Sequence, residues 1–514
     1  MTRRNHKPRH RQTKWTTVYV LVGLWVGISC TTAHKPDKPN VLLILVDDLR
    51  PAIGAYGDSI AITPNMDKLA AKGLLFKRAY SNQAVCGPSR YNLLLGSRST
   101  SSGIYNFGSD FRDHYPDAVT LPQYFKQHGY HAESMGKVFH VGHNTYDDTA
   151  SWSVPHYKDR VIEYVDSASK KEGFTREEAL FSNMEWGYAR SLPRGLAWES
   201  PDVADDAYAD GRISNRAIER LRNLKSNPDR PFFLAVGFAR PHLPFSVPKK
   251  YWDMYDESAL PLPQHTRRPE GAPSYAVKYG DEIDQYIPIP TTVTEAPFPD
   301  SLSRKLIHGY YAGVSYVDVQ IGKVLNELAA LGLDDNTIVV LWGDHGYMLG
   351  EMGMWTKHVN YELANRIPLI IAAPDMGSKG AHTTQLAETV DIYPTLADLA
   401  GLPAPEVTQS LDGLSMVSVL NNPEARIRDH AYHSFPRGGR LGRAIRTDRY
   451  RLVEWTKIDD PAEAAAYELY DYQNGPMEIT NIADEQPEVR ATLQSILGRH
   501  PAAMPPRPQS PRRE

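Results

Sequence analysis

The sequence contains very little cysteine: two residues in 514, at positions 30 and 86. This excludes the disulfide-rich class of secreted domains, because at most one disulfide can form. A basic excess is also missing, since 57 Lys and Arg stand against 61 Asp and Glu and the net charge is -4. Nucleic-acid-binding domains usually carry a strongly basic surface, so we expect no nucleic-acid partner.

The sequence also lacks an apolar run of the ~20 residues that a membrane-spanning helix needs. Its stretch TTVYVLVGLWVGIS is shorter, follows a basic segment without acids, and ends at Cys30. A basic region followed by an apolar core of ~7–15 residues is typical of a signal peptide. We therefore expect export, to the periplasm or to the outer membrane and cell surface of a bacterium.

The end of this apolar stretch, Gly27 to Cys30, resembles a bacterial lipoprotein signal. The resemblance implies that a lipid on Cys30 attaches the protein to a membrane. A plain cleaved signal and an uncleaved anchor remain as alternatives. If Cys30 is lost or lipidated, Cys86 has no disulfide partner, and a free thiol in an oxidising compartment calls for a separate explanation.

Long apolar runs recur beyond the linker and alternate with helical patterns. Runs such as NVLLILV, rich in β-branched residues, are typical of strands buried on both faces of a sheet. They occupy residues 40–46, 231–238, 336–343 and 367–374, and a long helical pattern covers 301–333. This alternation predicts an α/β sandwich with a large, mainly parallel central sheet.

The pattern of apolar and polar residues changes near residue 430. RAIRTDRYRLVEW alternates apolar and polar residues, as the strands of a half-exposed antiparallel sheet do, and AYELYDYQNGPME follows it. The last residues, PAAMPPRPQSPRRE, are rich in Pro and Arg, a composition typical of disorder. We predict a signal peptide at 1–30, a linker at 31–38, a catalytic domain at 39–428, a C-terminal subdomain at 429–500 and a disordered tail at 501–514.

Two polar pairs follow buried strands directly: Asp47-Asp48 after 40–46 and Asp344-His345 after 336–343. In open α/β sheets ligands bind at the carboxyl ends of the strands, so these side chains should converge there. Three carboxylates and an imidazole suit a hard divalent cation such as Ca²⁺, with Mg²⁺ as the alternative. Adjacent acids after a strand also occur in turns and helix caps, so the pairs alone leave both interpretations open.

The segment CGPSR, from Cys86 to Arg90, matches the C-x-P-x-R pattern of the type I, formylglycine-dependent sulfatases, which belong to the alkaline phosphatase-like superfamily. The chain resembles this family, and the resemblance implies that Cys86 is oxidised after translation to the aldehyde formylglycine. The hydrate of that aldehyde attacks the sulfur of a sulfate ester, and its second hydroxyl then allows the aldehyde to re-form. Cys86 therefore need not persist as a thiol.

Further segments follow in the order found in the iduronate-2-sulfatase group of that family: NVLLILVDDLRP, AVCGPSR, LPQYFKQHGY, GKVFH, PFFLAVGFARPHLPF, YYAGVSYVD and WGDHGYMLGE. The similarity spans roughly residues 39 to 400 and weakens in 141–230 and 255–300. It implies sulfate contacts from Lys137, His140 and Lys357, a general acid in His242, and a role for Arg90 in holding the aldehyde hydrate and supporting its metal-bound oxygen. The implied metal ligands are Asp47, Asp48, Cys86, Asp344 and His345.

The resemblance favours a 2-O-sulfated uronic acid, iduronate or glucuronate, at the end of a polysaccharide such as ulvan or a glycosaminoglycan. It also implies a partner that matures Cys86, either a formylglycine-generating enzyme or an anaerobic sulfatase-maturing enzyme. Two alternatives remain. One is a phosphonate or phosphate ester hydrolase of the same superfamily, and the other is a non-catalytic sugar-binding lipoprotein.

Overall fold

A central eight-stranded sheet forms the core of the protein. The structure is a computed structural model, and it describes residues 1–2, 38–160, 164–170, 173–460 and 462–513. The strand order is β10-β2-β11-β9-β1-β6-β3, and β12 pairs with β2. The strands are β1 (Asn40–Val46), β2 (Leu74–Tyr80), β3 (His131–Gly136), β6 (Phe232–Phe238), β9 (Thr337–Gly343), β10 (Arg366–Ile367), β11 (Leu369–Ala372) and β12 (His382–Glu388).

Strand β1 lies mid-sheet and pairs in parallel with both β6 and β9. Its residues alternate between two hydrophobic cores: Leu42, Ile44 and Val46 face one, and Val41, Leu43 and Leu45 face the other. A strand with apolar residues on both faces can be satisfied only between two layers of helices. The predicted α/β sandwich with a mainly parallel sheet is therefore confirmed, with β11 as an antiparallel insertion between β2 and β9.

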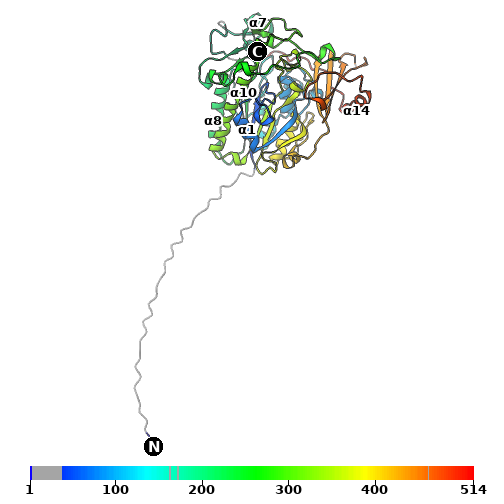
Figure 1. Ribbon diagram of the computed structural model, residues 1–514. Helices are drawn as coiled ribbons and strands as arrows, with labels where there is room; N and C mark the ends of the chain where they lie inside the picture. The colour runs from blue at the N-terminus through cyan, green and yellow to red at the C-terminus, as the bar shows by residue number, and fades with distance from the viewer. Residues whose placement is uncertain (3–37, 161–163, 171–172, 461, 514) are drawn as a thin grey trace. The chain divides into compact units, whose positions relative to one another are not determined.

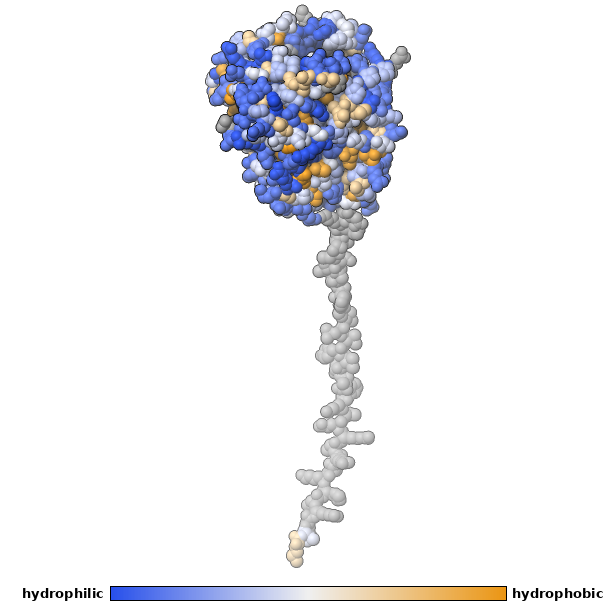
Figure 2. Space-filling view, turned by 90° about the vertical axis from the view of Figure 1, so that its right-hand side faces the viewer, coloured by the Kyte–Doolittle hydropathy of each residue, from blue (hydrophilic) through white to orange (hydrophobic). Residues whose placement is uncertain are grey.

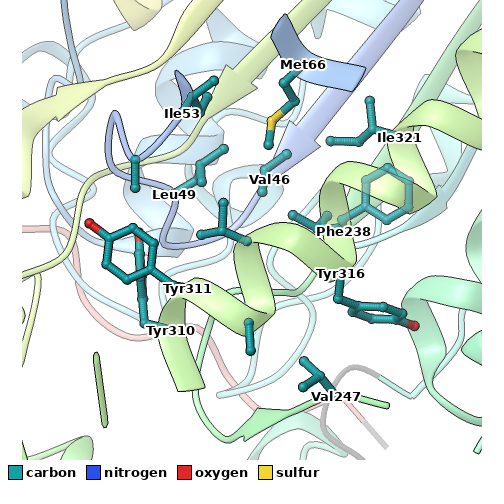
Figure 3. Packing of buried hydrophobic residues seen from close by; sticks show 14 of the residues in the cluster. Val46, Leu49, Ile53, Met66, Phe238, Val247, Tyr310, Tyr311, Tyr316 and Ile321 are labelled. Carbon is teal, nitrogen blue, oxygen red and sulfur yellow. The ribbon is translucent and has the colours of Figure 1, made fainter. Parts of the chain in front are cut away.

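Helices cover both faces of this sheet. The helices α1, α8 and α10 lie together on one side of it (Figure 1). Figure 3 shows Tyr310, Tyr316 and Ile321 of α10 in the same hydrophobic cluster as Val46 and Phe238, at the ends of β1 and β6. The helices are α1 (Pro64–Lys72), α2 (Cys86–Leu95), α3 (Ser99–Ser102), α4 (Phe111–His114), α5 (Leu121–Gln127), α6 (Arg176–Phe181), α7 (Trp186–Ser191), α8 (Ala209–Lys225), α9 (Lys249–Trp252), α10 (Asp300–Ala330), α11 (Glu362–Asn365), α12 (Ile392–Leu399), α13 (Val417–Asn421) and α14 (Pro487–Leu497).

The C-terminal part forms the predicted separate antiparallel sheet, in the order β13-β14-β15-β16. These strands span Ala431–Arg437, Arg440–Arg446, Tyr450–Lys457 and Ala466–Asp471, and α14 packs against them (Figure 1). Two-stranded pairs complete the fold: β4 (Gly195–Leu196) with β8 (Tyr286–Ile287), and β5 (Trp198–Glu199) with β7 (Phe245–Ser246).

The C-terminal segment 501–513 differs from the predicted disordered tail. It has no helix or strand, yet it lies along residues 100–110. The backbone N–H groups of Met504, Arg507 and Ser510 donate to the carbonyls of residues 100, 103 and 108 at 2.8, 2.8 and 2.6 Å. Prolines supply no N–H, and the spacing of three between these donors equals the period of a polyproline II helix. Composition alone did not reveal the surface that receives this segment.

The chain divides into two compact units, residues 1–35 and residues 36–514, and the sheets and helices above belong to the second. The predicted signal peptide, Cys30 and nearly all of the linker lie outside the described residues. Within the described residues, no helix combines the length and hydrophobicity needed to cross a membrane. Figure 2 shows one face of the molecule as mainly hydrophilic, with small scattered hydrophobic patches.

Candidate active site

The carboxyl ends of β1 and β9 bring the two polar pairs of the sequence together. Asp47-Asp48 follows β1 and Asp344-His345 follows β9, and these strands are neighbours in parallel register. The backbone N–H of Asp48 donates to Oδ1 of Asp344 at 3.1 Å. Asp48 has a φ of 56°, in the left-handed region that Asp and Asn occupy more readily than most residues. The expected convergence at this sheet edge is therefore observed.

Cys86 is the first residue of α2 and is buried beside these pairs. Its Sγ lies 3.2 Å from Nε2 of His345. Burial, and then the negative charge of Asp47, raise the pKa of the Cys86 thiol well above its ordinary value. Because the thiolate is the nucleophilic form of cysteine, an unmodified Cys86 is poorly suited to attack at neutral pH.

Arg90 lies one helical turn beyond Cys86 and is fully buried. Its Nη2 is 2.9 Å from Oδ2 of Asp344 and 3.4 Å from Oδ1 of Asp47. Arg90 also donates to the backbone carbonyls of Lys137 and Val138. Since all of these contacts are inside the site, Arg90 is not a surface residue of α2.

Lys137 and His140 enter from the loop that follows β3. The ammonium of Lys137 forms an ion pair with Asp47. Burial alone would raise the pKa of Asp47, but the charges of Lys137, His242 and Arg90 outweigh it and hold this pKa well below its ordinary value. Burial and the Lys137 charge lower the pKa of His140 well below the ordinary histidine value, so His140 is neutral.

His242 and Lys357 approach from the opposite side and share a carboxylate, Glu282. Nε2 of His242 lies 2.7 Å from Glu282, and its Nδ1 lies 2.5 Å from the carbonyl of Leu243. Both ring nitrogens thus face an oxygen atom that can accept a hydrogen bond. Lys357 lies 2.6 Å from Glu282 and 3.2 Å from Asp48. The geometry gives His242 a proton to donate.

Glu282 and Glu177 belong to the site, and the sequence did not single them out. Both line a cavity of about 120 Å³ that also contains Cys86, His242 and Lys357. Burial, together with the charge of Glu282, raises the pKa of Glu177 to about 8. The carboxyl group of Glu177 is therefore protonated at neutral pH and can donate a hydrogen bond to a bound hydroxyl.

The predicted metal ligands form one compact group of donors. Ligand atoms of Asp47, Cys86, Asp344 and His345 all lie within 4.8 Å of one another, and Asp48 groups with Cys86 and His242. Oδ1 of Asp48 is buried and lies 3.2 Å from Nζ of Lys357 and 3.3 Å from Nδ1 of His345, without a hydrogen bond of good geometry to a described residue. Several carboxylate oxygens in one buried place fit a hard divalent cation such as Ca²⁺ or Mg²⁺.

The structure places every residue predicted for the site around Cys86: nine of them are linked by contacts with one another, and His140 lines the same cavity as Cys86. The cluster consists of Asp47, Asp48, Cys86, Arg90, Lys137, His140, His242, Asp344, His345 and Lys357. We call this group the Cys86 cluster. Its chemistry combines a site for a cation, three basic side chains for an anion and a proton donor.

Comparisons with known proteins show which family the chain resembles. The family model described as Sulfatase matches residues 39–402, and the model described as N-sulphoglucosamine sulphohydrolase, C-terminal, matches residues 350–500. The chain is 33% identical to iduronate 2-sulfatase of Mus musculus, over 87% of this chain and 91% of that protein. It is 28% identical to an ulvan-active sulfatase of Formosa agariphila, over 82% of this chain and 74% of that protein.

The fold also matches solved structures. A phosphonate monoester hydrolase from Silicibacter pomeroyi superposes with a TM-score of 0.69 at 21% identity, covering 90% of this chain and 95% of that one. At this identity the match concerns the fold, and it confirms the alkaline phosphatase-like architecture expected from the sequence.

Proposed function

Since the chain belongs to the sulfatase family, we propose that it removes sulfate from a 2-O-sulfated uronic acid. As a member of this family it is a sulfuric ester hydrolase, and its relatives include enzymes of sulfated carbohydrates. The sugar is iduronate, glucuronate or a related unit at the end of a polysaccharide such as ulvan or a glycosaminoglycan. Support comes from the relatives named iduronate 2-sulfatase and ulvan-active sulfatase. The observation that carries the proposal is the Cys86 cluster.

Residue 86 is proposed to act as formylglycine. In that form it supplies a hydrated aldehyde, with one hydroxyl to attack sulfur and a second to release sulfate. The buried, protonated thiol of Cys86 supports this proposal, because it leaves the unmodified side chain without a nucleophile. Arg90, held by Asp344 and Asp47, fixes the position of residue 86 at the start of α2.

Asp47, Asp48, Asp344, His345 and residue 86 would hold a divalent cation, proposed to be Ca²⁺ with Mg²⁺ as the alternative. A cation there supplies positive charge that offsets the charge of a sulfate ester and lowers the pKa of a bound hydroxyl.

The remaining side chains have roles that follow from their charge and place. Lys137 and Lys357 present ammonium groups beside residue 86 and can bind sulfate oxygens, with His140 as a neutral third contact. His242 can give the proton on its Nε2 to the leaving sugar oxygen. Glu282 orients both His242 and Lys357.

The size of the cavity supports action on one terminal sugar. Its volume of about 120 Å³ is well below the ~300–1,000 Å³ of pockets for drug-sized ligands. The protein is further proposed to work outside the cytoplasm, in the periplasm or as a surface lipoprotein. Its partners there are a sulfated saccharide and, before that, an enzyme that matures Cys86.

The test begins with the mass of the tryptic peptide Ala79–Arg90, from protein made in a host that matures sulfatases. We expect the mass in which the CH₂–SH of Cys86 has become an aldehyde. The same sample should release sulfate from 2-O-sulfated uronate oligosaccharides, and only slowly release phosphate from matched phosphate esters. An unmodified thiol in that host would contradict the mechanism, and a preference for phosphate would favour the ester-hydrolase alternative.

Cys86→Ser is the matched control for this experiment. Serine keeps a hydroxyl but cannot form the aldehyde hydrate, so turnover should be lost while the melting temperature stays close to that of the wild type. Full sulfatase activity of Cys86→Ser, made where serine is not itself oxidised, would overturn the formylglycine proposal.

A further inference from the structure

A histidine that the proposed mechanism does not use, His358, lies in the wall of the same cavity. It directly follows Lys357 and lines the cavity together with Cys86. Its ring stacks on Phe435 at 6.0 Å and meets the ring of Phe107 edge-on at 6.3 Å. These two contacts fix the orientation of the imidazole, so its nitrogens have defined surroundings.

One nitrogen of His358 is already engaged. Nζ of Lys278 lies 2.7 Å from Nδ1 of His358. An ammonium group has only donors, so Nδ1 accepts and the proton of the neutral ring resides on Nε2. Burial, followed by the charges of Lys278 and Lys357, lowers the pKa of His358 well below the ordinary value, in agreement with a neutral ring.

The other nitrogen lacks a partner. Nε2 of His358 is buried and makes no hydrogen bond to any described residue. A buried N–H donor without an acceptor costs about 1–3 kcal/mol, so such groups in native proteins call for a ligand, a water or another explanation. Because His358 lines the substrate cavity, we infer that the missing acceptor is an atom of a bound ligand.

The charges around His358 indicate what kind of acceptor this is. Lys278 contacts it on one side, and Arg437 donates to its backbone carbonyl. Nε of Arg437 is likewise buried without a partner among the described residues. Of the carboxylates nearby, Asp281 pairs with Lys278, and Glu282 pairs with His242 and Lys357. Arg437 forms no ion pair with a described carboxylate, and although the charge of Asp281 also acts on it, an anion bound beside His358 would be attracted by its guanidinium.

We propose that His358, with Lys278 and Arg437 behind it, forms a second anion subsite that binds the carboxylate of the sugar whose sulfate enters the Cys86 cluster. The inference rests on the proposed function, because it requires a sugar that carries both groups. In a 2-O-sulfated uronic acid, C2 and C5 are opposite atoms of the six-membered ring. The carboxylate on C5 therefore reaches a wall of the cavity away from the sulfur.

The experiment compares two substrates that differ only at this group: a 2-O-sulfated uronate and its carboxyl-reduced analogue. His358→Phe keeps an aromatic ring between Phe435 and Phe107 and removes the N–H donor. A hydrogen bond to a charged group is worth about 1.5–3 kcal/mol, so kcat/KM for the uronate should fall by roughly 10- to 100-fold. The loss for the reduced sugar should be several-fold smaller, because it has a neutral acceptor there.

Two further variants sharpen the test. Lys278→Gln should reduce the same uronate preference by a smaller factor, since it removes charge and leaves the ring in place. His382→Phe, at an exposed position of β12, should leave both rates and their ratio unchanged.

The outcomes separate the two proposals. Equal losses of His358→Phe on both sugars, with an active wild type, would overturn the carboxylate subsite and leave the sulfatase proposal standing. A wild type that hydrolyses no sulfate ester, although Cys86 is matured, would overturn the proposed function and this subsite with it.

Discussion

His242 shows how much a single side chain in this protein depends on its neighbours. Its Nε2 lies 2.7 Å from Glu282 and its Nδ1 lies 2.5 Å from the carbonyl of Leu243, so the ring is oriented from both ends. A proton donor matters most when the leaving group is a poor one, such as a sugar hydroxyl. An activated aryl oxide leaves readily without a proton.

We therefore expect His242→Ala to lower kcat for the sugar sulfate by about 10²- to 10⁴-fold, the usual contribution of a general acid. The loss with 4-nitrophenyl sulfate should be at least tenfold smaller. Steady-state kinetics on both substrates measure the difference. His308→Ala removes a histidine that is equally buried but bonded to Trp252 and Glu257, and it should leave the ratio of the two rates unchanged. An equal loss on both substrates in His242→Ala would contradict its role as an acid.

Among single residues, the sequence predicted those that directly follow an apolar strand or lie one helical turn from a motif residue. Asp47 and Asp344 follow apolar strands, and Arg90 follows Cys86 by one turn, so spacing and pattern placed them in advance. Glu177 and Glu282 could not be found in this way. They come from segments of short helices and turns without a regular apolar period, and only the folded chain brings them to the cavity.

At the scale of elements, the C-terminal segment 501–513 shows where composition misleads. Proline-rich sequence forms no sheet or helix of its own, and this suggested disorder. The structure instead attaches the segment to residues 100–110, which carry Phe107 into the wall of the cavity. The order of such a segment depends on a partner surface that is distant in sequence, so no local pattern could predict it.

Deletion of residues 501–514 should therefore affect the active site. We expect faster hydrogen exchange in residues 100–110, because the N–H of Asp110 loses its acceptor and the three bonds that hold the carbonyls of this stretch in place are removed. KM should rise several-fold while kcat changes less, since Phe107 lines the cavity but is no part of the Cys86 cluster. Ser510→Ala removes one side-chain contact, to the N–H of Asp110 at 2.8 Å, and should have a much smaller effect. Unchanged exchange in residues 100–110 would show that the segment has no influence on this wall.

At the scale of the whole molecule, the C-terminal sheet supports the active site. The segment that carries Lys357 and His358 leads into α11, and residues of β13 to β15 hold it. Arg437 donates to the carbonyl of His358, and Arg451 donates to that of Asn360. The pattern of the sequence predicted this sheet correctly, but alternation of apolar and polar residues could not reveal what its polar residues contact.

Glu362, the first residue of α11, is the centre of this connection. Its carboxylate lies 2.6 Å from Arg451 and 3.1 Å from Arg446, and it accepts from Tyr80 of the central sheet at 2.9 Å. Burial would raise the pKa of Glu362, but the two guanidinium groups outweigh it and lower this pKa to about 2. The ion pairs thus join the two sheets through one buried carboxylate.

Breaking a buried ion pair by removing one partner costs about 3–5 kcal/mol, so Glu362→Gln should lower the free energy of unfolding by that order at pH 7. Because the pKa is lower in the folded state, the carboxylate stabilises the fold above the unfolded value of 4.5, and this contribution is lost as the pH falls toward 2. The difference in denaturant midpoint between wild type and Glu362→Gln should therefore shrink below about pH 4.5. Glu219→Gln, which removes the exposed pair with Arg216, should cost no more than about 1 kcal/mol. A difference that stays constant from pH 7 to pH 3 would show that Glu362 acts through its shape, and the sheets would then be joined mainly by apolar packing.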